Sequence, residues 1–156
     1  MSVQLSTENL EVKNNKPVVR HPSVTNRVYY IVFHSPNCPN CTARMPSIKK
    51  AIKKLSDAGL NNVFTMFDFS RNNNTDVYKK IVKNIPKIYI VIDDVSHTFR
   101  DDITSDNLLR RFMSENSKSK MLIRDKTIMT TDDLLDQLKI NKSKKNNFTE
   151  ITSIEL

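Results

Sequence analysis

The 156-residue sequence is short of the residues that several protein classes require. It has one glycine and no tryptophan. This excludes collagen-like chains, glycine-rich nucleotide-binding loops and β-propellers, because those classes need repeated glycines at fixed positions. The only cysteines are Cys38 and Cys41, so a secreted scaffold held together by several disulfides is excluded as well.

Long hydrophobic runs are also missing. The longest cover residues 28–33 and 88–92, and both are far shorter than the ~20 residues that a bilayer-spanning helix needs. Residues 1–20 carry charged side chains at intervals and contain no apolar run suited to a signal peptide. We therefore expect a soluble protein without a membrane span, located in the cytoplasm.

Positive charge dominates the composition. Lys and Arg number 25 against 17 Asp and Glu, the formal net charge is +8, and apolar residues make up 38%. The length suits one domain with a modest core, and the charge can attract nucleic acid, acidic proteins or anionic surfaces. A basic strip near the C-terminus has no interleaved aromatic residues and no recognisable motif, so nucleic-acid binding is not favoured. Its members are Arg110, Arg111, Lys118, Lys120, Arg124 and Lys126.

Changes in hydrophobic period predict the element order β-α-β-α-β-β-α over residues 28–116. Strands are expected at residues 28–34, 62–69, 87–92 and 95–99, and helices at about 39–55, 76–83 and 104–116. The two later helices are expected to bury Val77, Ile81 and Val82, and Leu108, Leu109, Phe112 and Met113, respectively.

The chain is divided by this pattern into three parts. Residues 1–26 look like an N-terminal arm with a short strand at 18–19, because asparagines and prolines interrupt any period. Residues 27–116 form the domain. Residues 117–156 form a basic C-terminal extension, with a short helix from 131 to 140 and a final segment, 151–156, that either pairs as a strand or stays loose.

The strand and the helix on either side of the cysteines are the clearest elements. Residues 28–34 are β-branched and aromatic without polar alternation, which is typical of a central strand buried on both faces. Pro46 should kink the helix that follows, and Gly59 suits a left-handed C-cap. The side of this helix opposite its apolar stripe is either a solvated face, the commoner case, or a docking face for an acidic partner. It carries Lys49, Lys50, Lys53 and Lys54.

The cysteine pair lies between that strand and that helix, in the sequence Cys38-Pro39-Asn40-Cys41. Cys38 would stand at the helix N-terminus, where unpaired backbone N–H groups and the positive end of the helix dipole stabilise a thiolate, the nucleophile of disulfide exchange. Cys41 would be buried one turn further on. Pro39 removes an N–H that has no partner in the first turn, and with Asn40 it sets the redox potential of the pair only loosely.

Residues 28–116 resemble the thioredoxin superfamily. Three features carry the resemblance: a strand followed by the Cys38–Cys41 motif, Pro46 five residues after the second cysteine, and Ile85-Pro86 ahead of a strand. The resemblance implies a thioredoxin-like three-layer α/β fold, with a mixed sheet and helices on both faces.

The resemblance also implies roles for single residues. Cys38 is the attacking thiol and Cys41 the thiol that resolves the mixed disulfide. Pro86 is a cis-proline that packs beside the cysteines, and with Ile85 it presents backbone to the substrate. Pro39, Asn40, His34 and Pro46 support the site.

The sequence departs from the thioredoxin pattern at three positions. It has Asn37 where thioredoxins carry an aromatic residue, and Val32 where they carry a buried aspartate that helps move protons to and from the resolving thiol. Asn84 stands where a glycine usually precedes the Ile-Pro step. Residues 35–39 also look glutaredoxin-like, but the Gly-Gly step with which glutaredoxins help bind glutathione is missing.

Two functions remain open at this point. The resemblance implies a thiol–disulfide oxidoreductase that acts on protein disulfides, exchanges electrons with an unidentified reductant or oxidant, and needs no metal or organic cofactor. The alternative is a thioredoxin-fold structural or adaptor protein, such as a virion component, in which the cysteine pair is catalytically idle, because fold does not imply function.

The histidines leave further alternatives. His21, His34 and His97 would have to complete any zinc site with the cysteines, but none has the usual local spacing of a zinc ligand. His34 ends the strand before the cysteines. It either tunes their pKa or, as is commoner at the end of a strand, satisfies local hydrogen bonds.

Overall fold

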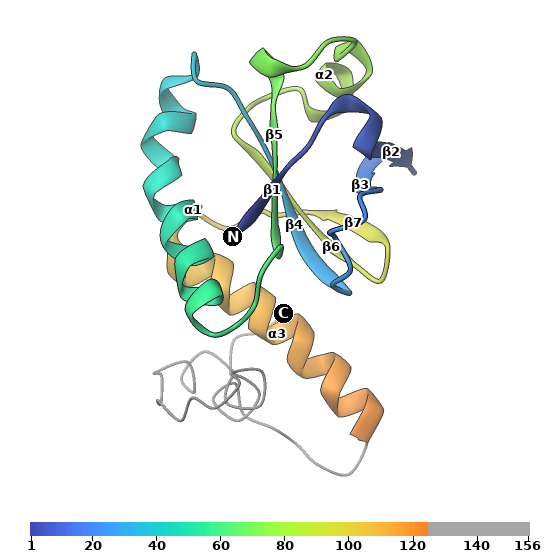
Figure 1. Cartoon of the computed structure of the whole chain (residues 1–156), viewed down its shortest axis with the longest axis vertical. Coiled ribbons are helices and arrows are strands. Elements are labelled where there is room, and N and C mark those ends of the chain that lie inside the picture. The colour runs from blue at the N-terminus through green and yellow to red at the C-terminus, as the bar shows by residue number, and fades with distance from the viewer. Residues whose placement is uncertain (125–156) are drawn as a thin grey trace.

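The computed structural model describes residues 1–124, with side chains up to residue 118. These residues form a five-stranded mixed sheet, a two-stranded hairpin and three α-helices (Figure 1). The helix predicted from residue 131 and the segment 151–156 lie outside the described residues.

The strand that precedes the cysteines is the central strand of the sheet. The strands are β1 (Ser2–Gln4), β4 (Val28–His34), β5 (Phe64–Asp68), β6 (Lys87–Ile92) and β7 (Val95–Thr98). Their order across the sheet is β1-β5-β4-β6-β7. β4 pairs in parallel with β5 and antiparallel with β6, while β1 joins β5 in parallel and β7 joins β6 antiparallel.

Both faces of the sheet are covered, which gives three layers. The covering elements are α1 (Pro39–Asp57), α2 (Asp76–Val82), α3 (Ser105–Arg124) and the hairpin of β2 (Leu10–Lys13) and β3 (Lys16–Val19). α1 and α3 pack on one face, and α2 and the hairpin pack on the other (Figure 1). Short 3-10 turns, Thr7–Asn9 and Phe69–Arg71, complete the described elements. The α/β class and the order β-α-β-α-β-β-α over residues 28–116 are confirmed.

β4 is buried on both faces, as its composition predicts. Its even-numbered residues, Val28 to Val32, join the core under α1 and α3, and its odd-numbered residues, Tyr29 to Phe33, join the core on the opposite face. Successive side chains of a strand point to opposite faces of the sheet. His34, the last residue of β4, therefore lies on the α1 face, two residues beyond Val32.

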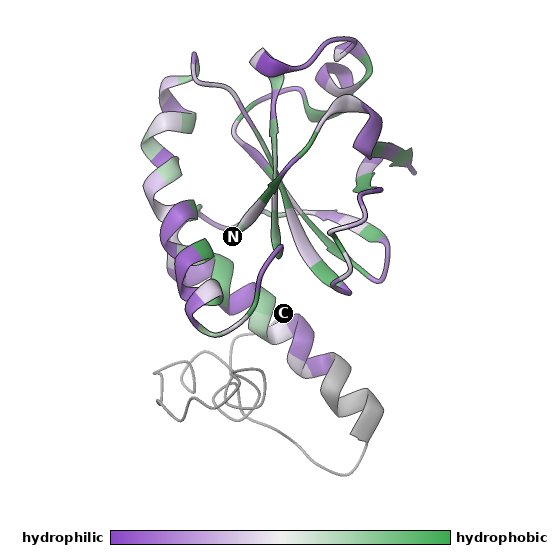
Figure 2. Cartoon of the chain, in the orientation of Figure 1, coloured by the Kyte–Doolittle hydropathy of each residue, from purple (hydrophilic) through white to green (hydrophobic). Residues whose placement is uncertain are grey.

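α1 and α3 bury the faces that the sequence predicts. Ile48 and Leu55 of α1 are at most 2% exposed, and Met45 and Ile52 pack partly against the same core. α3 buries Leu108, Leu109, Phe112 and Met113. The lysines on the other side of α1 are exposed, and Figure 2 shows hydrophilic colour along its outer face. Gly59, with φ 84°, takes the left-handed conformation expected after the helix.

The N-terminal segment differs from the predicted arm, except that the short strand expected at 18–19 lies within β3. β1 extends the main sheet, with Ser2 in register with Phe64, and β2 and β3 form a hairpin. Five apolar side chains of this segment are buried in the core on the α2 face: Val3, Leu5, Leu10, Val18 and Val19. The strands of this segment are three or four residues long, which is too short for a hydrophobic period to show. β1 forms by pairing with β5, a strand that is distant in the sequence.

Two helices also differ from their predictions. In α2, Val77 is 55% exposed and Tyr78 is buried instead, because the Tyr78 hydroxyl donates a hydrogen bond to the backbone oxygen of Leu10 at 3.1 Å. A helix of seven residues is too short for its period to define one face. α3 continues to Arg124, beyond the predicted end near residue 116. No helix within residues 1–124 combines the length and hydrophobicity that crossing a membrane requires.

A buried hydrogen bond joins β4 to α3 and offers a test of this packing. The Tyr30 hydroxyl donates to the backbone oxygen of Leu108 at 2.6 Å. We expect Tyr30→Phe to lower the free energy of unfolding by about 1 kcal/mol, because the hydrogen bond is lost inside the core. Urea unfolding followed by circular dichroism measures this change. The control is Tyr89→Phe, whose hydroxyl makes no hydrogen bond within the described residues; equal losses for the two variants would contradict the assignment.

Candidate active site

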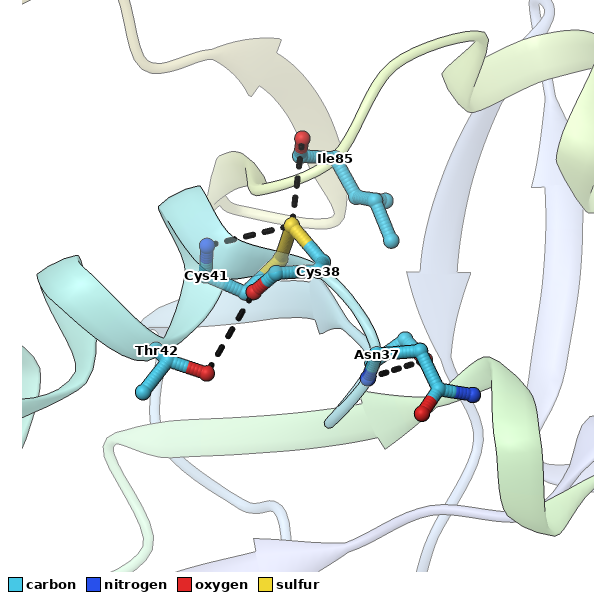
Figure 3. Close-up of a disulfide and its surroundings, with 6 residues drawn as sticks. Asn37, Cys38, Cys41, Thr42 and Ile85 are labelled. Carbon is cyan, nitrogen blue, oxygen red and sulfur yellow. Dashed lines mark hydrogen bonds between the residues drawn. A yellow bond between two sulfur atoms is a disulfide. The ribbon is translucent and has the colours of Figure 1, made fainter.

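The chain places the two cysteines where β4 meets α1 (Figure 3). Cys38 is the N-cap of α1: its backbone is extended, with φ −105° and ψ 109°, and its carbonyl accepts a hydrogen bond from the Thr42 N–H at 3.1 Å. Pro39 is the first helical residue. The sequence explains why α1 begins here, because an N-cap residue has non-helical backbone angles and proline suits the first position of a helix.

Cys38 and Cys41 form a disulfide, and their Cα atoms are 5.2 Å apart. Cys38 is half-buried. Cys41 is 2% exposed and lies in the first turn of α1, so the predicted burial of the second cysteine is confirmed. Of the two cysteines, Cys38 is therefore the more accessible to solvent.

The Cys38 sulfur lies among backbone polar groups. It accepts a hydrogen bond from the Cys41 N–H at 3.1 Å, and it is 3.7 Å from the carbonyl oxygen of Ile85 (Figure 3). In the reduced protein, the same N–H and the positive end of the α1 dipole stabilise a negative charge on this sulfur. The first turn of α1 contains no acidic residue that would oppose this effect.

The loop before β6 approaches the cysteines from the neighbouring strand. The Ile85–Pro86 peptide bond is cis, the state that the resemblance implies. β6 begins at Lys87, which is the register partner of Phe33. Because antiparallel neighbours bring the end of one strand beside the start of the next, this pairing carries Ile85 to Cys38. Ile85 and Pro86 are both half-buried, so part of each remains open to solvent.

The supporting residues named from the sequence lie around the pair in different ways. Pro39 and Asn40 are exposed at the start of α1. Pro46 lies within α1, and it lines a cavity of about 390 Å³ together with Cys41 and His34. A second cavity, of about 250 Å³, is lined by Ile85 and Ser35 with Phe69, Val82, Lys79 and Lys83.

The three positions that depart from the thioredoxin pattern lie in different surroundings. Val32 is fully buried in the core under α1, so no carboxylate occupies that position on β4. Asn37 is exposed, and its N–H donates a hydrogen bond to the Ser35 hydroxyl at 3.3 Å. The third position, Asn84, is exposed, and the positive φ of this loop belongs to its neighbour Lys83, at 69°.

His34 and Asp68 end adjacent parallel strands and are register partners. They share the α1 face of the sheet, and both line the cavity beside Cys41. The Nε2 atom of His34 is buried and has no hydrogen-bond partner in the described part of the chain, so local hydrogen bonding does not account for it. Asp68 is 8% exposed and accepts hydrogen bonds from the backbone N–H and the hydroxyl of Ser70, at 2.8 and 2.7 Å.

Burial lowers the pKa of His34 below its usual value of 6.5, while the negative charge of Asp68 raises it and the positive charge of Arg71 lowers it. The imidazole is therefore neutral at neutral pH and able to accept a proton. The sequence identified His34 but not Asp68. The available signal was positional: Asp68 falls near the end of the predicted strand 62–69, at the sheet edge where the cysteines lie.

The zinc alternative finds no support in the arrangement of side chains. Among the described residues, no group of three or more His, Cys, Asp or Glu side chains is placed to hold a metal ion. His34 lines the cavity beside Cys41, whereas His97 lies in β7, at the far edge of the sheet, and His21 follows β3.

In the basic strip named from the sequence, Arg111 and Lys118 form ion pairs with Glu115, with N···O distances of 2.9 and 3.8 Å.

Comparison with solved structures identifies the architecture. The chain is similar to a crystal structure of ERdj5, with a TM-score of 0.54 and 18% identity over 72% of this chain and 14% of that one. It is similar to human ERp44 in a zinc-bound form, with a TM-score of 0.50 and 17% identity over 69% and 30%. It also matches the first thioredoxin domain of mouse protein disulfide-isomerase A4, with a TM-score of 0.48 and 15% identity over 66% and 76%.

The chain has a thioredoxin fold, as the resemblance implies. It spans less than a third of the ERdj5 and ERp44 chains described above. No protein-family model and no curated protein matches the sequence itself. At identities of 15% to 18%, the similarity shows the fold alone.

The position of Cys38 predicts its acidity. In the reduced protein, we expect the pKa of the Cys38 thiol to lie below about 8.5, the value of a free thiol, because the Cys41 N–H and the helix dipole stabilise the thiolate. The variant Cys41→Ser leaves a single thiol, whose ionisation is followed by thiolate ultraviolet absorbance against pH. The matched variant Cys38→Ser should show a pKa above that of a free thiol, because Cys41 is buried. A Cys38 midpoint at or above the free-thiol value would refute this assignment.

Proposed function

We propose that the chain is a thiol–disulfide oxidoreductase that exchanges its Cys38–Cys41 pair with disulfides of protein substrates. One observation carries the proposal: Cys38 is half-buried at the N-terminus of α1 with its sulfur 3.7 Å from the Ile85 carbonyl oxygen, while Cys41 is buried one turn away. This arrangement gives the two sulfurs different accessibility and different electrostatic surroundings, as an attacking and a resolving thiol require.

In the reductive direction, the Cys38 thiolate attacks one sulfur of a substrate disulfide. A mixed disulfide forms, and the other substrate sulfur leaves as a thiolate that takes a proton from water. Deprotonated Cys41 then attacks the Cys38 sulfur, the mixed disulfide breaks, and the second substrate sulfur leaves and is protonated in turn. Two electrons have then moved from the pair to the substrate. A separate dithiol reductant must restore the pair, and the reversed steps oxidise a substrate dithiol.

We assign substrate binding to Ile85 and Pro86. The segment ends at the start of β6 and brings a backbone carbonyl beside the reactive sulfur. An extended peptide can pair with exposed backbone of this kind, so that main-chain hydrogen bonds align its disulfide with Cys38. The cytoplasm, as the proposed location, would keep the pair in the dithiol form that reduces substrates.

The alternative function is a structural or adaptor protein with an idle cysteine pair. Val32 favours it, because the core under α1 lacks a carboxylate at the position that the resemblance associates with proton transfer. The two functions differ in turnover and not in fold, so an activity measurement separates them.

Reduction of insulin by dithiothreitol, followed by turbidity, tests the proposal. The wild-type chain should accelerate the reaction, and Cys38→Ser should return the rate to that of dithiothreitol alone, because the attacking sulfur is gone. Cys41→Ser should instead accumulate a mixed disulfide with insulin, visible by mass spectrometry. A folded wild-type chain that gives the rate of dithiothreitol alone would rule out the oxidoreductase and favour the adaptor.

A further inference from the structure

The α1 face at the end of β4 and β5 holds two ionisable side chains that disulfide exchange at Cys38 does not use. Nε2 of His34 is buried without a hydrogen-bond partner in the described part of the chain, and Asp68, its register partner, is 8% exposed. A buried nitrogen normally has a partner, because its desolvation is otherwise uncompensated. His34 also lines the cavity beside Cys41, and its unpartnered nitrogen calls for a functional reason.

We propose that His34 is the group that exchanges a proton with the Cys41 thiol, and that Asp68 stabilises the imidazolium formed. This inference rests on the proposed disulfide exchange and adds a catalytic residue to it. Cys41 requires such a group because its thiol is buried, and burial disfavours the thiolate that must attack Cys38.

The three side chains line one cavity, and the strand geometry explains why. Val32 and His34 lie on the same face of β4, and α1 covers this face. Val32 offers no proton acceptor. His34 lies two residues further along β4, on the same face and nearer to the cysteines. The parallel pairing of β4 with β5 sets Asp68 directly beside His34, and α1 supplies Cys41 to the same cavity.

The charges around His34 favour a neutral base that can be protonated. Asp68, from β5, raises its pKa, and Arg71, in the turn that follows, lowers it. One carboxylate oxygen of Asp68 accepts both hydrogen bonds of Ser70, and the other is 3.6 Å from Arg71. Lys49 of α1 lines the cavity as a further cation. Lys87 of β6 is the partner of Phe33 and so lies on the opposite face of the sheet.

The step is balanced in protons and electrons. With the substrate held on Cys38 as a mixed disulfide, neutral His34 takes the proton of the Cys41 S–H group. The Cys41 thiolate forms the bond to the Cys38 sulfur, and the bond from Cys38 to the substrate sulfur breaks. The substrate thiolate takes a proton from water, and the imidazolium returns its proton to solvent through the cavity. In the oxidising direction the imidazolium protonates Cys41 as the disulfide opens.

The experiment isolates the resolving step. Reduced protein is mixed in a stopped-flow instrument with a limiting amount of dithiodipyridine, whose reduction releases a coloured thione. Attack by Cys38 gives the first phase of release, and attack by Cys41 on the mixed disulfide gives the second. We expect His34→Gln to leave the first phase unchanged and to slow the second by roughly 10²-fold at neutral pH, the lower end of what a general base contributes.

The pH profile distinguishes proton transfer from a structural role. In the wild type the second phase should slow as pH falls through the His34 pKa, because the imidazolium cannot accept a proton. In His34→Gln this acid-side midpoint should disappear, and the rate should follow ionisation of the Cys41 thiol at alkaline pH. In Asp68→Asn the midpoint should move to lower pH, because the charge that raises the His34 pKa is removed.

Controls separate the failure of this inference from failure of the proposed function. His97→Gln, a substitution in β7 at the far edge of the sheet, should leave both phases unchanged. A second phase that keeps its rate and pH profile in His34→Gln overturns the role of His34 and leaves exchange at Cys38 intact. Loss of the first phase in the wild type would overturn both.

A second measurement depends neither on turnover nor on the folding of His34→Gln. In reduced wild-type protein, nuclear magnetic resonance should show the His34 ring titrating. Ionisation of the Cys41 thiol at alkaline pH should also change the chemical shift of the ring, because the two groups interact. Cys41→Ser should abolish this alkaline change. An identical curve in both proteins would show that His34 does not sense the Cys41 thiol and would overturn the inference.

Discussion

The site depends on the pairing of β4 with β6. β4 ends where α1 begins, and β6 starts directly after the cis Ile85–Pro86 bond. Because the two strands run antiparallel with Phe33 opposite Lys87, the helix N-terminus and the loop meet at one edge of the sheet. The Cys38 sulfur then lies between a backbone N–H and a backbone carbonyl. The buried residues of β4 hold this register, since a slip of one residue would move each side chain from the core on one face into the core on the other, where it does not fit.

Two sulfurs three residues apart in sequence lie in contrasting surroundings. Cys38 is half-buried at the positive end of α1, and Cys41 is buried within the first turn of the helix. The electrostatics of a helix N-terminus therefore act mainly on the first sulfur, and desolvation acts mainly on the second. Because burial disfavours the Cys41 thiolate, the second thiol needs a proton acceptor before it can attack Cys38. The end of β4 and β5 supplies an imidazole and a carboxylate to the cavity where that thiol lies.

Much of this structure could be predicted from the sequence, because the signals were local. The buried composition of β4, the helical period of α1 and the proline in its first turn each act over a few residues, and together they placed Cys38 at a helix N-terminus. β1 could not be predicted in the same way, since it is defined by pairing with β5 across the chain. The helical period predicted a buried Val77, but Tyr78 is buried instead, because a hydrogen bond to the hairpin orients α2. The partnership of His34 with Asp68 is a matter of strand register, which sequence spacing does not contain.

The central claim is that the sulfur of Cys38, and not that of Cys41, carries the reactive negative charge at neutral pH. Brief treatment of the reduced wild-type chain with a limiting amount of iodoacetamide, followed by peptide mass spectrometry, tests it most directly, because alkylation requires a thiolate that solvent can reach. The account predicts that the label is found on Cys38 with Cys41 unmodified. Equal labelling of both sulfurs, or labelling of Cys41 first, would contradict it.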